Sequence, residues 1–141
     1  MPRIPATKYV GPNGAVVYRP VIIVTIEIGG MAARGPAMID SGADDTLVPA
    51  EAIIPLGVDY ASLPIAPGGS GAGGGFEIRH STGLMKWDKV ELMRGFKVAE
   101  PGKIDTVLLG RADFFKLYIP RFHWYKDPPV FDLDPATKGK S

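Results

Sequence analysis

Short stretches of alternating apolar and polar residues run along this chain, and glycine and proline interrupt them often. Val16–Ile28 (VVYRPVIIVTIEI) is rich in β-branched residues, which favour an extended backbone, so it predicts one long strand or two. Pro20 cannot donate a backbone hydrogen bond and is expected at an edge or a bulge. Gly29-Gly30 then predicts a turn into a strand over Met31–Asp40. With 18 glycines and 14 prolines, the sequence predicts an all-β protein with frequent turns.

The rest of the chain continues this alternation of short strands and turns. Residues 1–8 have two prolines and no periodicity, so an extended or mobile arm is expected there. The polar residues 135–141 are expected to form a frayed tail. No linker or repeat divides the chain, so residues 1–141 are interpreted as one domain. Between arm and tail we expect a helical turn or two over Pro49–Ile54, with Pro49 at the first helical position and Pro55 and Gly57 ending the helix. A second short helix is expected within Arg111–Leu117. The strands expected in this region are Ser62–Ala66, Phe76–His80, Leu84–Lys86, Lys89–Met93, Asp105–Leu109, Tyr118–Lys126 and Val130–Leu133.

One of the predicted turns is rich in acidic residues. In Ala37–Pro49 (AMIDSGADDTLVP), an apolar strand ends at Asp40, turns at Gly42 and resumes after two further acids. Asp40 would therefore lie at the end of a buried strand, in a loop held by a rigid sheet, where catalytic groups are often found. An ordinary Asx turn, in which Asp40 bonds to its own backbone, explains the same residues.

A glycine-rich segment follows at Pro67–Gly75. Residues 69–74 (GSGAGG) match the GxGxxG pattern of phosphate-binding loops, which requires a strand before it and a helix after it. Phe76–His80 instead alternates with the period of a strand, so a nucleotide site is excluded. The pattern favours a β-hairpin whose glycine tip can swing and approach a bound peptide. A disordered glycine linker is the alternative.

The third motif, Leu108-Leu109-Gly110-Arg111, ends a short apolar strand and precedes the predicted helix. Asp-Ser-Gly-Ala, then a glycine-rich hairpin containing Gly74-Gly75-Phe76, then Leu-Leu-Gly-Arg, occur in an order that resembles the retropepsin-like aspartic proteases. The resemblance covers residues 15–134. It implies an all-β, single-domain acid-protease barrel with a glycine-rich flap hairpin and one short helix after the Leu-Leu-Gly strand.

The resemblance also implies roles for the loop that begins at Asp40. Asp40 would be the catalytic acid or base, Ser41 would bond across a dimer axis to the partner's loop, and Gly42 would complete this catalytic loop. Asp44 would bind substrate amides and pair with Arg111, although a purely structural ion pair fits the sequence equally well. The substrate-binding residues implied are Ala43, Asp44, Asp45, Gly73, Gly74, Gly75 and Phe76, and the supporting residues are Leu108, Leu109, Gly110 and Arg111. Asp45, assigned to an outer subsite, is alternatively a solvated side chain.

Such a site needs two carboxylates that share one water and one proton. Asp40 is the only aspartate followed by glycine two positions later. The resemblance therefore implies a homodimer that places Asp40 of each subunit at a two-fold axis and hydrolyses peptide bonds of a protein or peptide substrate.

Composition narrows the other possibilities. A net charge of +1 gives no electrostatic reason to expect nucleic-acid binding, and the absence of cysteine excludes disulfides and thiolate sites. Val21–Ile28 is too short to span a membrane and contains Glu27, and the first ten residues lack the apolar region of a signal peptide, so a cytoplasmic protein without a membrane partner is expected. His80 and His123 have no partner at a metal-ligand spacing, so neither a metal nor a cofactor is expected.

Two other functions fit the same sequence. A catalytically silent protein of this fold would serve as a peptide-binding or dimerisation module. An unrelated β-barrel binding domain would carry Asp-Ser-Gly by coincidence.

Overall fold

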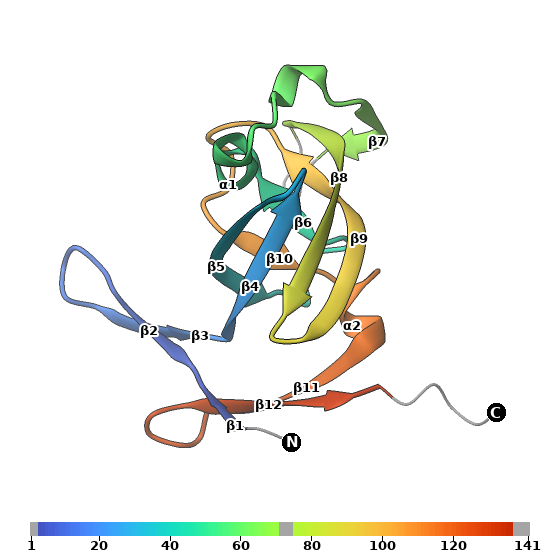
Figure 1. The fold of residues 1–141 in the computed structure, drawn as a ribbon. Helices are drawn as coiled ribbons and strands as arrows, with labels where there is room; N and C mark the ends of the chain where they lie inside the picture. The colour runs from blue at the N-terminus through green and yellow to red at the C-terminus, as the bar shows by residue number, and fades with distance from the viewer. Residues whose placement is uncertain (1–2, 71–74, 137–141) are drawn as a thin grey trace.

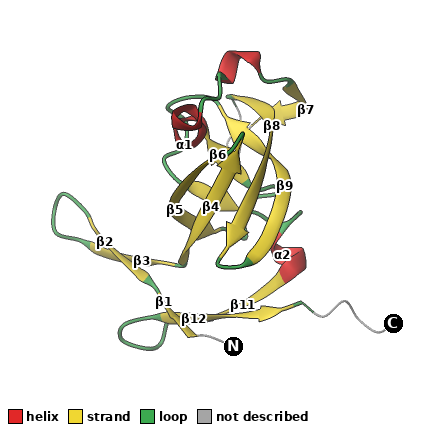
Figure 2. Ribbon diagram, in the orientation of Figure 1, coloured by secondary structure: helices red, strands yellow, loops and turns green. Residues whose placement is uncertain are grey.

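The chain forms a closed β-barrel with a small sheet below it and a hairpin that stands to one side (Figure 1). The structure is a computed structural model that describes residues 3–70 and 75–136. Strands predominate, and the helices are short (Figure 2). The strands are β1 (Arg3–Pro5), β2 (Thr7–Val10), β3 (Val16–Arg19), β4 (Val21–Ile28), β5 (Met31–Ile39), β6 (Leu47–Pro49), β7 (Ile65–Ser70), β8 (Glu77–Trp87), β9 (Val90–Ala99), β10 (Val107–Leu109), β11 (Tyr118–His123) and β12 (Val130–Pro135); the helices are α1 (Ala50–Ile53), α2 (Phe114–Leu117) and two 3₁₀ helices, Ile54–Leu56 and Tyr60–Ser62.

The barrel closes because β4 pairs with both β5 and β8. Around the ring the strand order is β4, β5, β10, β6, β9 and β8, with β7 added beside β8. β10 lies between β5 and β6, parallel to the first and antiparallel to the second. The chain after β5 must therefore pass the chain after β10 before it re-enters the barrel as β6. The all-β barrel expected from the sequence is confirmed.

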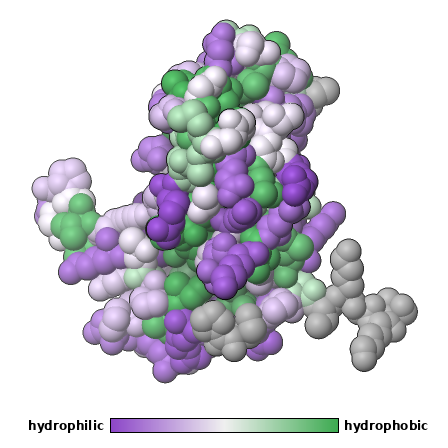
Figure 3. All heavy atoms as spheres, in the orientation of Figure 1, coloured by the Kyte–Doolittle hydropathy of each residue, from purple (hydrophilic) through white to green (hydrophobic). Residues whose placement is uncertain are grey.

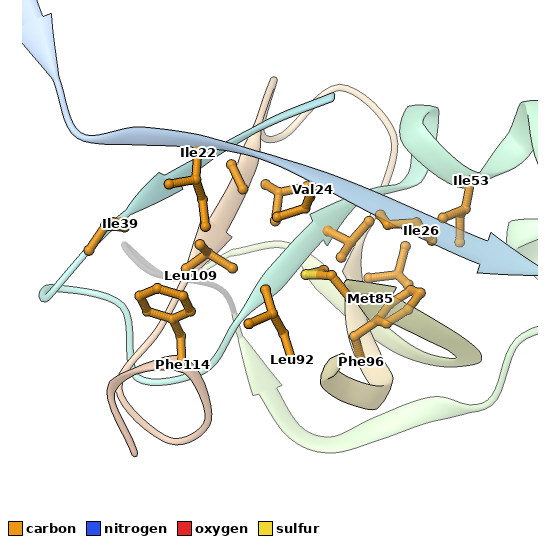
Figure 4. Packing of buried hydrophobic residues seen from close by; sticks show 14 of the residues in the cluster. Ile22, Val24, Ile26, Ile39, Ile53, Met85, Leu92, Phe96, Leu109 and Phe114 are labelled. Atoms are coloured by element: carbon orange, nitrogen blue, oxygen red, sulfur yellow. The ribbon is translucent and has the colours of Figure 1, made fainter. Parts of the chain in front are cut away.

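Alternation along the strands supplies the barrel core. In β4, Ile22, Val24 and Ile26 are buried between more exposed neighbours, as the two-residue period of a strand requires. Ile39 at the end of β5 and Leu109 at the end of β10 join the same cluster. Figure 4 shows these side chains packed together with those of Met85, Leu92, Phe96 and Phe114 from β8, β9 and α2.

The small sheet has the order β1-β12-β11, so part of the expected N-terminal arm is a paired strand. Phe131 and Leu133 of β12 are fully buried and belong to the barrel core. On the other face, Arg3 donates to both carboxylate oxygens of Asp132, at 3.1 and 3.2 Å. These bonds, together with His123 Nε2 at 2.8 Å from Asp132 Oδ2, lower the pKa of Asp132 to about 2. The ion pair therefore persists well into the acid range.

Several predicted boundaries were wrong. Pro55 does not end the first helix, because it lies near the start of the 3₁₀ helix Ile54–Leu56, where its missing amide hydrogen costs nothing. Gly57, with φ of 87°, is the residue that ends this helix. Pro49 is the last residue of β6 and the N-cap of α1 rather than its first helical residue. The strand expected at Ser62–Ala66 begins only at Ile65, after the 3₁₀ helix Tyr60–Ser62.

Other predictions agree with the structure. Pro20 separates β3 from β4, and Gly29 and Gly30 turn β4 into β5 with φ of 57° and 84°. The short helix after β10 is present as α2. β12 continues to Pro135, so the expected frayed tail begins later than residue 135, and residues 137–141 lie outside the described part of the chain.

The hairpin β2–β3 forms a sheet of its own. Its strands pair from Thr7↔Arg19 to Val10↔Val16, and Val10, Val16 and Val17 are exposed. Figure 3 shows hydrophobic surface at this hairpin, which stands beside the barrel. None of the helices in the described residues is long and apolar enough to cross a membrane.

We predict that the small sheet and the barrel unfold together, as one domain requires. Phe131→Ala removes a fully buried ring from the shared core and should lower the free energy of unfolding by about 3–5 kcal/mol. Phe122, its register partner on β11, is 46% exposed, so Phe122→Ala should cost about 1 kcal/mol or less. Urea titrations that follow fluorescence and circular dichroism separately would check this. Two separate transitions in the wild-type protein would contradict a single domain.

Candidate active site

Asp40 directly follows the last residue of β5, and the sheet fixes its backbone. Its amide donates to the carbonyl of Leu109 at 3.0 Å, which continues the pairing of β5 with β10 by one residue. Ile39 points into the barrel core, so Met38 and Asp40, its neighbours in an alternating strand, belong to the opposite face. Asp40 therefore lies on the outside of the barrel wall and is half-buried.

The loop after Asp40 is closed by its own hydrogen bonds. The Gly42 amide donates to Asp40 Oδ1 at 2.9 Å, and the Ala43 amide donates to the Asp40 carbonyl at 3.2 Å. A Cβ at Gly42 would lie 3.2 Å from Asp40 Oδ1, so a side chain there would crowd the carboxylate. Ser41 and Gly42 are exposed, whereas Ala43 is buried. The Asx turn is thus present, and it orients one oxygen of Asp40 while the loop tip faces solvent.

Gly110 is where the loop after β10 crosses the loop after β5. A Cβ at Gly110 would lie 2.3 Å from the Asp45 carbonyl carbon, which no real structure tolerates. The Arg111 amide donates to the Ala43 carbonyl at 3.0 Å, and the Ala112 amide donates to the Asp44 carbonyl at 2.8 Å. The Leu-Leu-Gly-Arg segment therefore holds the Asp40 loop through its backbone.

Thr46 and Asp113 form a second clamp between these loops. The Thr46 hydroxyl donates to Asp113 Oδ1 and accepts from the Gly110 amide at 3.0 Å, and Thr46 is almost fully buried. Asp113 also caps α2 by accepting from the Phe114 amide at 2.7 Å. Sequence reasoning missed both residues. An Asp directly before a helix is an N-cap signal, and Thr46 is a polar residue at the start of a buried run, so both could have been found.

The other two acids of the loop are paired. Asp44 forms an ion pair with Arg111, as the sequence had suggested. Asp45 Oδ2 lies 2.6 Å from Lys97 Nζ of β9, so it is not simply solvated. No cation among the described residues forms an ion pair with Asp40. Of the three acids in the loop, Asp40 alone has its charge free for another group.

An apolar cluster lies on the same outer face as Met38. Leu108 pairs in register with Met38 on one side and Leu47 on the other, and paired residues share a face. Leu47 and Leu108 pack with side chains that come from the base of the glycine-rich hairpin and from the loop before β10. The further members of this cluster are Ala66, Phe76, Ile78, Ala99 and Ile104.

The glycine-rich segment joins β7 to β8, which are antiparallel. The antiparallel pairing of β7 and β8 agrees with the predicted hairpin, whose glycine tip at residues 71–74 lies outside the described residues. Gly75 is exposed with φ of 100°, and Phe76 is half-buried against the apolar cluster. Gly73 and Gly74, two of the residues expected to bind substrate, lie outside the described residues.

A polar cluster fixes the base of this hairpin. Arg79 Nε lies 2.6 Å from Glu77 Oε1, and the Arg79 guanidinium donates to the carbonyls of Ala61 and Leu63 at 2.9 and 2.8 Å. The bond from Arg79 lowers the pKa of Glu77. Burial, followed by the hydrogen bond to Glu77, raises the pKa of Tyr60 to about 12. The segment before β7 is therefore joined to β8, a contact that no local sequence pattern predicts.

The described residues contain no group of three or more His, Asp or Glu side chains that could hold a metal ion. His80 is exposed on β8, and His123 is bonded to Asp132 on the small sheet.

We predict that Thr46→Val destabilises the loop crossing. The valine keeps the shape of threonine but leaves the Gly110 amide without its acceptor in a buried position, which should cost about 1–3 kcal/mol of unfolding free energy. Thr82→Val, at an exposed position, is the matched control and should change stability little. Denaturant titration measures both, and equal stability of the two variants would show that the clamp contributes nothing.

Comparison with known proteins agrees with this geometry. No protein-family model and no curated protein sequence matches the chain. Among solved structures, the EIAV protease complexed with the inhibitor HBY-793 is 23% identical, with a TM-score of 0.52 over 67% of this chain and 83% of that one. A retropepsin-like aspartic protease from Rickettsia conorii is 18% identical, with a TM-score of 0.51 over 94% of this chain and 88% of that one. The order of the three motifs, the β10 crossing and these similarities together show that the chain has the retropepsin-like fold.

Proposed function

We propose that the protein is an aspartic endopeptidase that acts as a homodimer through Asp40 of each subunit. The observation that carries this proposal is the position of Asp40. It lies on the outer face of the barrel wall, on a backbone fixed by Leu109 and Gly42, with its charge unpaired within the described residues. The similarity to two aspartic proteases supports the same reaction class.

One Asp40 cannot perform the whole reaction. Hydrolysis of a peptide bond needs a base that takes a proton from water and an acid that donates one to the scissile carbonyl. Two carboxylates close together cannot both be charged, so one holds a proton and the other is the base. Water then adds to the carbonyl carbon, the C–N bond breaks, and the leaving nitrogen takes up a proton. A second chain must supply the second carboxylate.

The surroundings of Asp40 suit an extended peptide. The apolar cluster around Leu47 and Leu108 offers a floor for apolar side chains beside the loop. Gly75, exposed just before β8, offers backbone groups without a side chain, which suits contact with a peptide backbone. Ser41, exposed next to Asp40, is available to bond to the partner's loop.

A catalytically silent peptide-binding module is the second candidate. It is favoured by the fact that one chain contains only one Asp-Ser-Gly carboxylate, so a protein that stays monomeric would keep the apolar surface beside Asp40 without the reaction. The two candidates differ in whether peptides are cut or only bound.

We predict that Asp40→Asn abolishes proteolysis and leaves the fold intact. The amide cannot take a proton from water, whereas it can still accept the hydrogen bond from the Gly42 amide. Cleavage of a denatured protein substrate, followed by mass spectrometry, measures the loss. Asp59→Asn, which changes an exposed acid outside the loop, is the control and should retain activity. Undiminished cleavage by a well-folded Asp40→Asn protein would rule out the aspartic protease mechanism.

We further predict that activity depends on assembly. Specific activity should fall as the protein is diluted below its dimer dissociation constant, because each subunit supplies half of the site. Excess Asp40→Asn protein added to a fixed amount of wild type should inhibit it by forming mixed dimers with one carboxylate. Native mass spectrometry would verify subunit exchange. Constant activity at a large excess of the variant, with exchange complete, would mean that each subunit works alone.

A further inference from the structure

The β2–β3 hairpin projects from the body of the protein beside the barrel (Figure 1). Both of its ends are fixed. The Ala6 amide donates to the Pro129 carbonyl at 3.0 Å, and the Ile39 amide donates to the Pro20 carbonyl at 2.8 Å. The hairpin is therefore held at its base, and one of the two anchors is the residue that precedes Asp40.

The hairpin is apolar toward its turn. Nearer its base, Tyr9 and Arg19 line a groove between the hairpin and the barrel. Toward the turn, Val10, Val16 and Val17 are 63%, 47% and 48% exposed. Val10 and Val16 pair in register and share one face, whereas Val17 belongs to the other. The end of the hairpin therefore presents apolar side chains on both of its faces.

A hairpin of this kind needs support from another surface. Among the described strands, β2 and β3 pair only with each other. A sheet of two strands is marginally stable in water, because it buries little apolar area. A surface that covered the three valines would remove that area from water and stabilise the hairpin. The structure therefore indicates a binding partner for its end.

The proposed reaction already requires a second copy of this chain near the hairpin. The base of the hairpin is bonded to Ile39, so a copy whose Asp40 meets this Asp40 must lie beside it. The exposed tip of the catalytic loop consists of Ser41 and Gly42, which are small. Two such tips cover far less than the roughly 800 Å² that each partner of a stable complex buries. The dimer therefore needs further contact area.

Two other surfaces supply this area less well than the end of the hairpin. The outer face of the small sheet carries ion pairs, such as that of Arg3 with Asp132, and β1 is already paired within the chain. Two hairpins side by side would bring like charges together, because Thr7–Arg19 contains Lys8 and Arg19 and no acidic residue. The end of each hairpin is therefore expected on the body of the other copy.

We infer that the end of the β2–β3 hairpin binds a second copy of this chain and stabilises the dimer. The inference rests on the proposed function, which is the reason for a second copy beside Asp40. By two-fold symmetry each subunit contributes one hairpin, whose Val10, Val16 and Val17 pack on the body of the partner. The hairpin supplies contact area and no catalytic group.

The test measures the dimer dissociation constant by sedimentation velocity over a dilution series. The double variant Val10→Thr, Val16→Thr keeps the shape and strand preference of valine but brings two hydroxyls into the contact. Its dissociation constant should be about tenfold higher than that of wild type, or more. Val90→Thr makes the same change at a 43% exposed position of β9, so it is the matched control and should dimerise like wild type. Circular dichroism verifies that each variant is folded.

Hydrogen exchange of the unaltered protein gives a second readout. The amides of Val16–Arg19 should exchange about threefold more slowly, or slower still, above the dimer dissociation constant than below it, because docking keeps a marginally stable hairpin closed. Exchange that does not change with protein concentration would contradict the inference.

These measurements separate the hairpin from the reaction. If the hairpin variant weakens the dimer while wild type cuts no peptide, the proposed function fails and the role of the hairpin stands. If wild type cuts peptides in a dilution-dependent way while the hairpin variant dimerises as tightly as Val90→Thr, the inference is overturned and the proposed function stands. Wild-type protein that stays monomeric at every concentration overturns the inference as well.

Discussion

The close approach of two loops at Gly110 is the constraint on which the candidate site depends. A Cβ at this position would lie 2.3 Å from the Asp45 carbonyl carbon, so glycine is required for the crossing. Because β10 lies between β5 and β6, the loop after β5 must cross the loop after β10, at the ends of these two strands, to reach β6. Amides of Arg111 and Ala112 and the hydroxyl of Thr46 then join the loops. Asp40 thereby gains a fixed backbone although the tip of its loop is exposed.

Charge is distributed around this crossing in a way that singles out Asp40. Asp44 and Asp45 are paired with Arg111 and Lys97, and Asp113 accepts hydrogen bonds from Thr46 and from the start of α2. Those acids stabilise the loops. Within the described residues Asp40 forms no ion pair, so its carboxylate is left for a group outside the described part of the chain.

The chain before β4 adds two structures outside the barrel, which are the strand β1 and the β2–β3 hairpin. β1 pairs with β12 of the same chain, so the small sheet has an N-terminal strand without any contribution from another molecule. The β2–β3 hairpin is fixed at Pro20 beside the Asp40 loop and forms one wall of a groove whose floor is Met38 and Leu108. The same segment that starts the chain thus shapes the approach to the candidate site.

The sequence by itself determined what depends on local pattern. Alternating β-branched residues and paired glycines specified the β4–β5 hairpin, and Asp-Ser-Gly after an apolar strand located the candidate site, because short-range backbone preferences and face alternation act within a few residues. Only the tertiary structure decided which distant groups meet. The Thr46–Asp113 hydrogen bond, the Lys97–Asp45 ion pair and the contact of Arg19 with Met38 join residues that are 67, 52 and 19 positions apart. Such contacts follow from the crossing of the loops after β5 and β10 and from the hydrogen bond between the Ile39 amide and the Pro20 carbonyl. The alternation of residues within a single strand does not predict either of them.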